Sequence, residues 1–178
     1  DTAKTDAWSG FAQGEFHVVP DLLDVVAGYR LTQDRKHGVN LVAAGPIVYS
    51  YNDTKSSYLI GLNATLTEDI LLYGRYSTGF VAGGTVGDVE YEPETVKSWE
   101  AGVKADLLDR RLRINLALFS TKYKSVHGIT SGFRVGRPQL GVIVAPLGDL
   151  DADGVELEVS ARPLEGLTLS GSFGYTDY

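Results

Sequence analysis

The chain has 178 residues, and 16 Lys and Arg against 23 Asp and Glu give it a net charge of −7 at pH 7. This length suits one domain or a piece of a larger one, and the negative charge argues against a nucleic-acid-binding protein, which needs a basic face. There is no Cys, which excludes disulfides, thiolate metal sites and a Cys nucleophile. No apolar run approaches the ~18 residues of a transmembrane helix, but a membrane β-barrel with alternating strands remains compatible with this composition.

A hairpin pattern recurs four times along the chain. In each copy, a short polar turn separates two stretches in which apolar and polar residues alternate, which is the signature of β-strands. The turns centre near Asp21, Glu68, Arg110 and Glu165. The pattern predicts about eight antiparallel strands in an up-and-down meander, and no segment has a convincing helical period.

The alternation gives each strand one apolar and one polar face. The apolar sets are, in chain order, Leu23, Val25, Ala27, Tyr29 and Leu31; Trp99, Ala101, Val103, Ala105 and Leu107; Leu112, Ile114, Leu116 and Leu118; Val155, Leu157, Val159 and Ala161; and Leu167, Leu169, Phe173 and Tyr175. Such a face is either the dry core of a soluble sandwich or lipocalin-like barrel, or the lipid-facing surface of a membrane barrel.

Long connections separate the hairpins, at about residues 35–57, 81–96 and 124–142. Because short and long connections alternate strictly, all short turns are expected at one end of the sheet and all long loops at the other. Transmembrane barrels have this asymmetry, with short periplasmic turns and long extracellular loops, whereas compact soluble domains rarely carry three such loops. Aromatic residues near strand ends favour the membrane barrel as well: Tyr76, Phe80, Trp99 and Tyr123.

Three segments strongly resemble the β-barrels of TonB-dependent outer-membrane receptors: Leu71–Phe80, Tyr91–Lys124 and Asp153–Asp177. The motifs that carry the resemblance are Tyr73 with Gly79-Phe80; Pro93-Glu94; the Glu-x-Gly-x-Lys strand Glu100, Gly102 and Lys104; the aromatic pair Phe119 and Tyr123; and the Gly-x-Glu-x-Glu strand Gly154, Glu156 and Glu158 with a turn at Pro163. The segment Ala27–Arg30 resembles a further strand of the family. Together these motifs cover nearly the whole chain outside the long loops.

The resemblance implies an all-β fold, in which an antiparallel meander of about eight strands is part of a larger, 22-stranded transmembrane β-barrel. We therefore expect residues 1–178 to be a fragment of the barrel domain without the plug domain, in the outer membrane of a Gram-negative bacterium. The absence of Met at position 1 agrees with a processed or excised segment.

The function that the resemblance implies is TonB-energised uptake of a scarce nutrient, with a ferric siderophore as the first candidate. The implied partners are this nutrient, the TonB system acting through the missing plug, and outer-membrane lipid including lipopolysaccharide, with no nucleic acid. No catalytic constellation is visible, so we expect neither an enzyme nor a cofactor. The alternative is a complete small eight-stranded outer-membrane barrel with a structural or adhesion role.

The candidate ligand-binding residues are aromatic, His and Arg side chains in the long loops. Tyr49 and Tyr51 fall in the first loop, and His127, Arg134 and Arg137 fall in the third. Aromatic rings and Arg suit an anionic iron chelate through stacking and charge. Ordinary loop packing and contact with anionic lipopolysaccharide would use the same residue types, so these alternatives stay open.

The segment from Asp149 to Gly154 reads Asp-x-Asp-x-Asp-Gly, the opening of a calcium-binding loop. Position twelve of that motif would be Ser160, where a bidentate Glu is required, and a strand follows where a helix should be. A polar strand top is the better interpretation, and the weak metal candidate consists of Asp149, Asp151 and Asp153. Because the acids share strand parity with Val155, they must rise above the hydrocarbon, or Gly154 must form a bulge that exchanges the faces.

Overall fold

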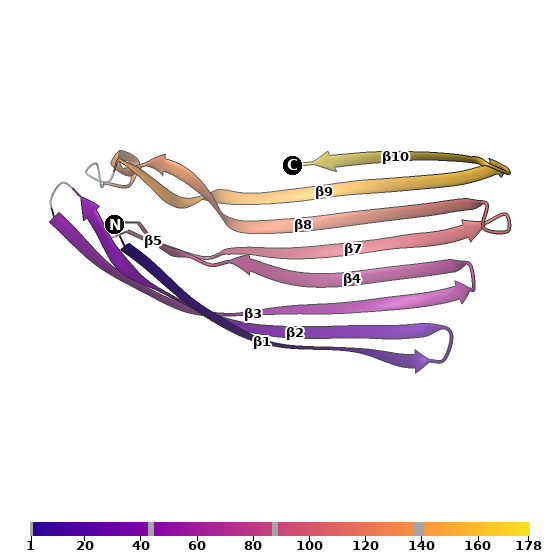
Figure 1. Cartoon of the computed structure of the whole chain (residues 1–178), viewed down its shortest axis with the longest axis horizontal. Coiled ribbons are helices and arrows are strands. Elements are labelled where there is room, and N and C mark those ends of the chain that lie inside the picture. The colour runs from indigo at the N-terminus through magenta and orange to yellow at the C-terminus, as the bar shows by residue number, and fades with distance from the viewer. Residues whose placement is uncertain (1, 43–44, 87–88, 137–140) are drawn as a thin grey trace.

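The computed structural model describes residues 2–42, 45–86, 89–136 and 141–178. Eight strands form one antiparallel sheet in the order β1-β2-β3-β4-β7-β8-β9-β10, which confirms the predicted meander (Figure 1). The sheet is open, because among the described residues β1 and β10 each pair with a single neighbour. An open sheet is what a section of a larger barrel requires, whereas a complete small barrel would pair its first strand with its last.

The strands of the main sheet are β1 (Thr2–Val19), β2 (Leu23–Val42), β3 (Gly45–Thr67), β4 (Ile70–Val81), β7 (Glu94–Leu107), β8 (Leu112–Ser131), β9 (Val142–Leu164) and β10 (Leu167–Asp177). A separate two-stranded hairpin, β5 (Gly84–Val86) and β6 (Val89–Tyr91), is inserted between β4 and β7, and a 3-10 turn covers Gly132–Val135. In the described part of the chain, no helix is long and apolar enough to cross a bilayer.

The four short turns lie together at one end of the sheet, at residues 20–22, 68–69, 108–111 and 165–166 (Figure 1). Their positions confirm the sequence prediction. Asp21 adopts φ 60° and Gly166 adopts φ 79°, the left-handed conformation that Asp tolerates better than most residues and that Gly adopts freely.

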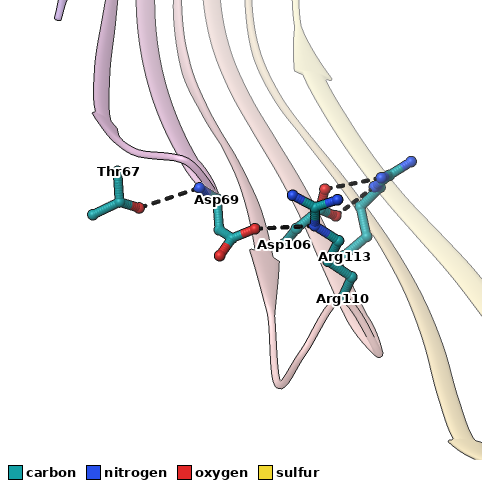
Figure 2. A network of polar contacts seen from close by, with 5 residues as sticks. All are labelled: Thr67, Asp69, Asp106, Arg110 and Arg113. Carbon is teal, nitrogen blue, oxygen red and sulfur yellow. Dashed lines mark hydrogen bonds and ion pairs between the residues drawn. The ribbon is translucent and has the colours of Figure 1, made fainter. Parts of the chain in front are cut away.

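Figure 2 shows that polar side chains connect two of these turns. The Nε of Arg110 donates to Oδ1 of Asp69 at 3.2 Å, and the backbone N–H of Asp69 donates to the hydroxyl of Thr67 at 3.3 Å. Across the β7–β8 turn, Arg113 donates from Nε and from Nη2 to the two carboxylate oxygens of Asp106, at 2.6 and 2.9 Å. This paired geometry holds the two strands in register where they enter the turn.

The register places apolar residues opposite one another across the sheet. Leu116 on β8 faces Val103 on β7 and Leu157 on β9, and Leu157 in turn faces Phe173 on β10. Phe173 is nevertheless 60% exposed, and the buried hydrophobic residues of the described chain are few: Tyr51, Ile143, Ala145 and Ala152. The apolar face therefore has no protein core against it, which rules out the soluble sandwich and agrees with a surface covered by lipid.

Three aromatic rings border the apolar face on the side away from the short turns. The ring centroids of Tyr58 and Tyr76 are 5.8 Å apart, and those of Tyr76 and Trp99 are 4.5 Å apart. Aromatic residues of this kind gather at the interface between hydrocarbon and headgroups. We refer to Tyr58, Tyr76 and Trp99 as the aromatic girdle.

The long connections are much shorter than the sequence suggested. Strands β2 and β3 are 20 and 23 residues long in all, and both run on past the girdle through most of the stretch expected as the loop 35–57. Likewise β8 continues to Ser131 and β9 begins at Val142, within the expected loop 124–142. Beyond the membrane both faces of a strand are wet, so the alternation that identifies a strand disappears while the backbone ladder continues.

The three acids near the top of β9 lie at or beyond the level of the aromatic girdle. The register passes through Gly154 without a break, because Asp153 faces Ser120 and Gly154 faces Phe119. Ser120 is itself opposite Trp99 of the girdle, so Asp153 lies at the interface level. The expected bulge is therefore not at Gly154. The irregularity is further out, at Ser125 with φ 57°.

Candidate ligand-binding surface

The Glu-x-Gly-x-Lys motif forms a polar cluster on the face opposite the apolar one, which we call the polar face. Glu100 accepts hydrogen bonds from the Tyr73 hydroxyl at 2.9 Å and from Nη2 of Arg75 at 2.7 and 2.9 Å. The Nζ of Lys104 lies 5.6 Å from the centre of the Tyr73 ring. A Cβ on Gly102 would come within 2.7 Å of that ring, so glycine is needed for Tyr73 to lie across the strand.

Further along the polar face, an outer cluster forms where β2 and β3 extend past the girdle. Lys36 on β2 faces Tyr51 on β3, and its Nζ lies 5.7 Å from the ring centre. The Nζ also donates to the Gly83 carbonyl at 2.6 Å. The Tyr51 hydroxyl donates to Oδ2 of Asp53 at 3.1 Å. Because Tyr51 is only 5% exposed, burial and the Asp53 carboxylate raise the pKa of its phenol above the ordinary value.

These contacts hold the β5–β6 hairpin against the polar face. Gly83 and Gly84 are buried, and a Cβ on Gly83 would lie 2.7 Å from the Tyr51 hydroxyl. Residues of β5 contact β3, and residues of β6 contact β9. The hairpin thus bridges the outer extensions of the two halves of the sheet on the side that faces the barrel interior.

His127 lies on the other side of this hairpin. Its ring meets the Tyr91 ring edge-on at 5.0 Å, and its Nε2 is 2.6 Å from the Glu92 carbonyl oxygen. The backbone N–H of His127 donates to Oε2 of Glu94 at 3.1 Å. Tyr91 on β6 pairs with Gly84 on β5. His127 therefore contacts the β6 side of the hairpin, and Lys36 contacts its β5 side through Gly83.

The structure corrects where the sequence-predicted ligand residues lie. Tyr49, Tyr51 and His127 belong to strands β3 and β8 and not to loops. The side chain of Arg134 and the whole of Arg137 lie outside the described residues.

The sequence-based prediction, which looked for ligand residues in the loops, missed Lys36 and Tyr91. Lys36 contacts the β5–β6 hairpin, and Tyr91 belongs to it. The feature of the sequence that could have indicated these contacts is the Gly83-Gly84 pair, because glycine lets the backbone approach a side chain closely.

The acids at the top of β9 make separate contacts. Oδ1 of Asp149 accepts the Ser125 N–H at 3.0 Å, and Oδ2 of Asp151 lies 3.7 Å from Nζ of Lys122. Across the described residues, no three His, Asp or Glu side chains are grouped so that they could hold a metal ion. All three acids belong to strand β9.

Comparisons with known proteins agree with this architecture. Residues 1–178 match the family model described as TonB dependent receptor-like, beta-barrel. The metal-pseudopaline receptor CntO of Pseudomonas aeruginosa is 33% identical over 120 residues, which are 66% of this chain and 16% of that protein.

Solved structures are similar over almost the entire chain. The ferric yersiniabactin uptake receptor FyuA from Yersinia pestis has a TM-score of 0.74 at 18% identity, covering 98% of this chain and 27% of that one. The copper transporter OprC has a TM-score of 0.77 at 13% identity, covering 98% and 28%. At these identities the likeness establishes the fold. The chain spans about a sixth of the curated relative's length and about a quarter of the solved chains.

Proposed function

We propose a function from the premise that the chain belongs to the TonB-dependent receptor family, as a section of its outer-membrane β-barrel. In this proposal the chain is part of a receptor that imports a metal–siderophore complex, and the preferred candidate is a ferric siderophore. Members of this family are transport receptors of the Gram-negative outer membrane. The chain is accordingly an outer-membrane protein. The plug domain and the TonB system are the further parts that uptake by the whole receptor would require.

The observation that carries the proposal is the set of side chains around the β5–β6 hairpin. It consists of the outer cluster with Lys36 and Tyr51 on one side and of His127 with Tyr91 on the other. There, aromatic, cationic and imidazole side chains gather around one hairpin, at the end of the barrel opposite the short turns. Rings and cations of this kind bind an anionic metal chelate by stacking and charge. The names of similar proteins, a metal-pseudopaline receptor and a ferric yersiniabactin uptake receptor, support the same ligand class.

The candidate residues take different roles in this proposal. Tyr49 and His127 are proposed to contact the chelate directly. Tyr51 is buried and is proposed as a positioning residue that holds the hairpin. Arg134 and Arg137 are proposed to attract the anionic ligand, by virtue of their charge and their place in the chain between β8 and β9.

The test is uptake of radiolabelled iron by cells that carry or lack the full-length parent gene. Deletion should abolish uptake of one ferric siderophore, complementation should restore it, and a protonophore should block it because transport is energised by the proton gradient. If deletion leaves uptake of every ferric siderophore unchanged but removes uptake of copper or another metal, the ferric assignment is wrong. If no metal uptake changes, the proposed function is wrong.

A further inference from the structure

In the described part of the chain, one arginine on the polar face of β2 has no carboxylate as an ion-pair partner. This residue, Arg30, donates from Nη2 to the Ser9 hydroxyl at 2.6 Å and from Nε to the Thr32 hydroxyl at 3.2 Å. Its Cζ lies 5.9 Å from the centre of the Phe11 ring. These contacts orient the guanidinium, and among the described residues they leave both N–H groups of Nη1 and one of Nη2 without an acceptor. A guanidinium held in this way can bind an anion.

A hollow of about 270 Å³ lies beside this guanidinium, and we call it the Arg30 pocket. Gly28 precedes Arg30 on the same face of β2, and its missing side chain leaves room between β1 and β3. The wall is mainly apolar. The lining residues on the polar face are Phe11, Gln13, Gly28, Arg30, Ser57 and Leu59. The pocket therefore suits a ligand that carries an anionic group on a carbon skeleton.

The charge around the pocket is positive. On the polar face of β1, β2 and β3, no acid lies within two residues of the level of Arg30, as far as the described residues extend. Lys55, which is opposite Thr32, is the nearest cation on the outward side, and it pairs with Asp53 at 3.4 Å. On the inward side, the first acid is Glu15, about 13 Å from the level of Arg30 at the spacing of a strand.

The pocket is also separate from the outer cluster. Lys36 lies six residues further out than Arg30 on β2, which is about 20 Å at the spacing of a strand. Between the two cations, Asp34 faces Asp53 on the same face of the sheet. Two opposed acids repel an anion, so an anionic ligand has two distinct positions along β2, one at the outer cluster and one at the Arg30 pocket.

We propose that the Arg30 pocket is a second binding site for the imported metal chelate, inward of the outer cluster, and that it binds a carboxylate of that chelate. A carboxylate is planar and accepts two parallel N–H bonds from a guanidinium. The carbon skeleton next to the carboxylate would pack against Phe11 and Leu59. This inference rests on the proposed function, because the chelate is its ligand, and it narrows the substrate class to chelates that carry carboxylate groups.

The test measures how fast phenylglyoxal modifies Arg30 in the full-length receptor in detergent, by peptide mass spectrometry, with citrate as the probe. Arg30 is exposed and should react when citrate is absent. Citrate at about ten times its Kd leaves about one tenth of the sites free, so the modification should slow about tenfold. The neutral trimethyl ester of citrate should give no protection. The matched control is Arg35, which is exposed on the opposite face of the same strand and should react equally with and without citrate.

Two glycine variants test the hollow without changing charge. A Cβ on Gly28 meets nothing closer than 3.5 Å, and a Cβ on Gly10 meets nothing within 4 Å, so both positions accept a side chain. Gly28→Val fills the hollow and should abolish the protection of Arg30 by citrate. Gly10→Val, on the opposite face of the neighbouring strand β1, should leave the protection unchanged. Correct folding of each variant is checked by heat-modifiable migration on gels.

Four results would count against parts of this account. An Arg30 that is unreactive without citrate would show that another part of the receptor, such as the plug, fills the pocket, and would overturn the proposal. Equal protection by sulfate would reduce the pocket to a general anion site and overturn the carboxylate assignment. No protection by citrate, together with loss of iron uptake on deletion of the parent gene, would overturn this inference alone. Protection by citrate without any change in metal uptake on deletion would keep the carboxylate site, remove the chelate as its ligand and refute the proposed function.

Discussion

Tyr76 and Trp99 occupy directly opposed positions on β4 and β7, and their rings are 4.5 Å apart and tilted by 43°. They mark the level at which the sheet leaves the hydrocarbon, so the depth of other residues can be counted from them. Trp99 faces Ser120, and Leu116 lies four residues further along β8 toward the short turns. Leu116 is therefore well inside the apolar band.

Arg in place of Leu116 should strongly destabilise the folded parent barrel. A cationic side chain on the lipid face costs ~2–4 kcal/mol near the bilayer midplane. The free energy of unfolding in a bilayer, measured by denaturant titration, is the appropriate readout. The control is Asn115→Arg, because Asn115 is on the polar face, where its amide donates to Glu158 at 3.3 Å. Equal losses in the two variants would show that the faces are assigned wrongly.

The orientation of the barrel predicts which end is accessible from outside the cell. Single Cys residues at Glu90, on the hairpin, and at Glu68, in a short turn, are both at exposed positions. Thr85 of the same hairpin is unsuitable because its hydroxyl is buried. An impermeant thiol reagent added to whole cells should label position 90 and spare position 68. Labelling at 68 with protection at 90 would invert the topology.

The isolated 178-residue chain should aggregate in water. Its sheet has two open edges, at β1 and β10, and an apolar face without a core. Unpaired strand edges and exposed apolar surface both favour association. Analytical ultracentrifugation with and without detergent measures the effect. A monodisperse monomer that melts cooperatively in plain buffer would contradict this account of the sheet.

Removal of the Tyr51 hydroxyl should loosen the β5–β6 hairpin. Tyr51→Phe keeps the ring but removes the hydrogen bond to Asp53 and the contact with Gly83. One such hydrogen bond contributes about 0.5–1.5 kcal/mol, so amide exchange in the hairpin should accelerate about two- to tenfold in the full receptor. Tyr49→Phe on the same strand is the control and should leave exchange in the hairpin unchanged. Identical exchange in the Tyr51 variant and the unaltered receptor would contradict the positioning role.

Tyr51 should also ionise only above the ordinary pKa of a tyrosine. It lies seven residues beyond Tyr58 of the girdle, outside the membrane, and burial followed by the Asp53 carboxylate raises its pKa. At pH values below the ordinary tyrosine pKa near 10, the phenol is protonated and its contribution to the stability of the folded state is fully present. That contribution is lost as the pH rises through the raised pKa of the folded state. In a pH titration, the ultraviolet absorbance of tyrosinate should therefore be the same for the unaltered receptor and for Tyr51→Phe around pH 10. The two absorbances should differ only at higher pH. A difference already present at pH 10 would refute the shift.

The short turns, the strand count and the two faces could be predicted from the sequence because each depends on neighbouring residues. A strand alternates its side chains between faces with period two, so the parity of Leu112 to Leu118 determines which of them meet lipid. Turn residues such as Asp21 and Gly166 are likewise local signals. The family motifs were recognisable for the same reason, since Glu100, Gly102 and Lys104 are close in sequence.

The contacts that define the sites were decided by the tertiary structure. Arg30 and Phe11 become neighbours only through the register of β1 with β2, and Tyr51 meets Gly83 only because a hairpin folds back on the sheet. The outer strand extensions were hidden for a further reason: a strand that is wet on both faces shows no hydrophobic period and resembles a loop. Local patterns determine which residues can share a face, whereas register and chain reversal determine which of them touch.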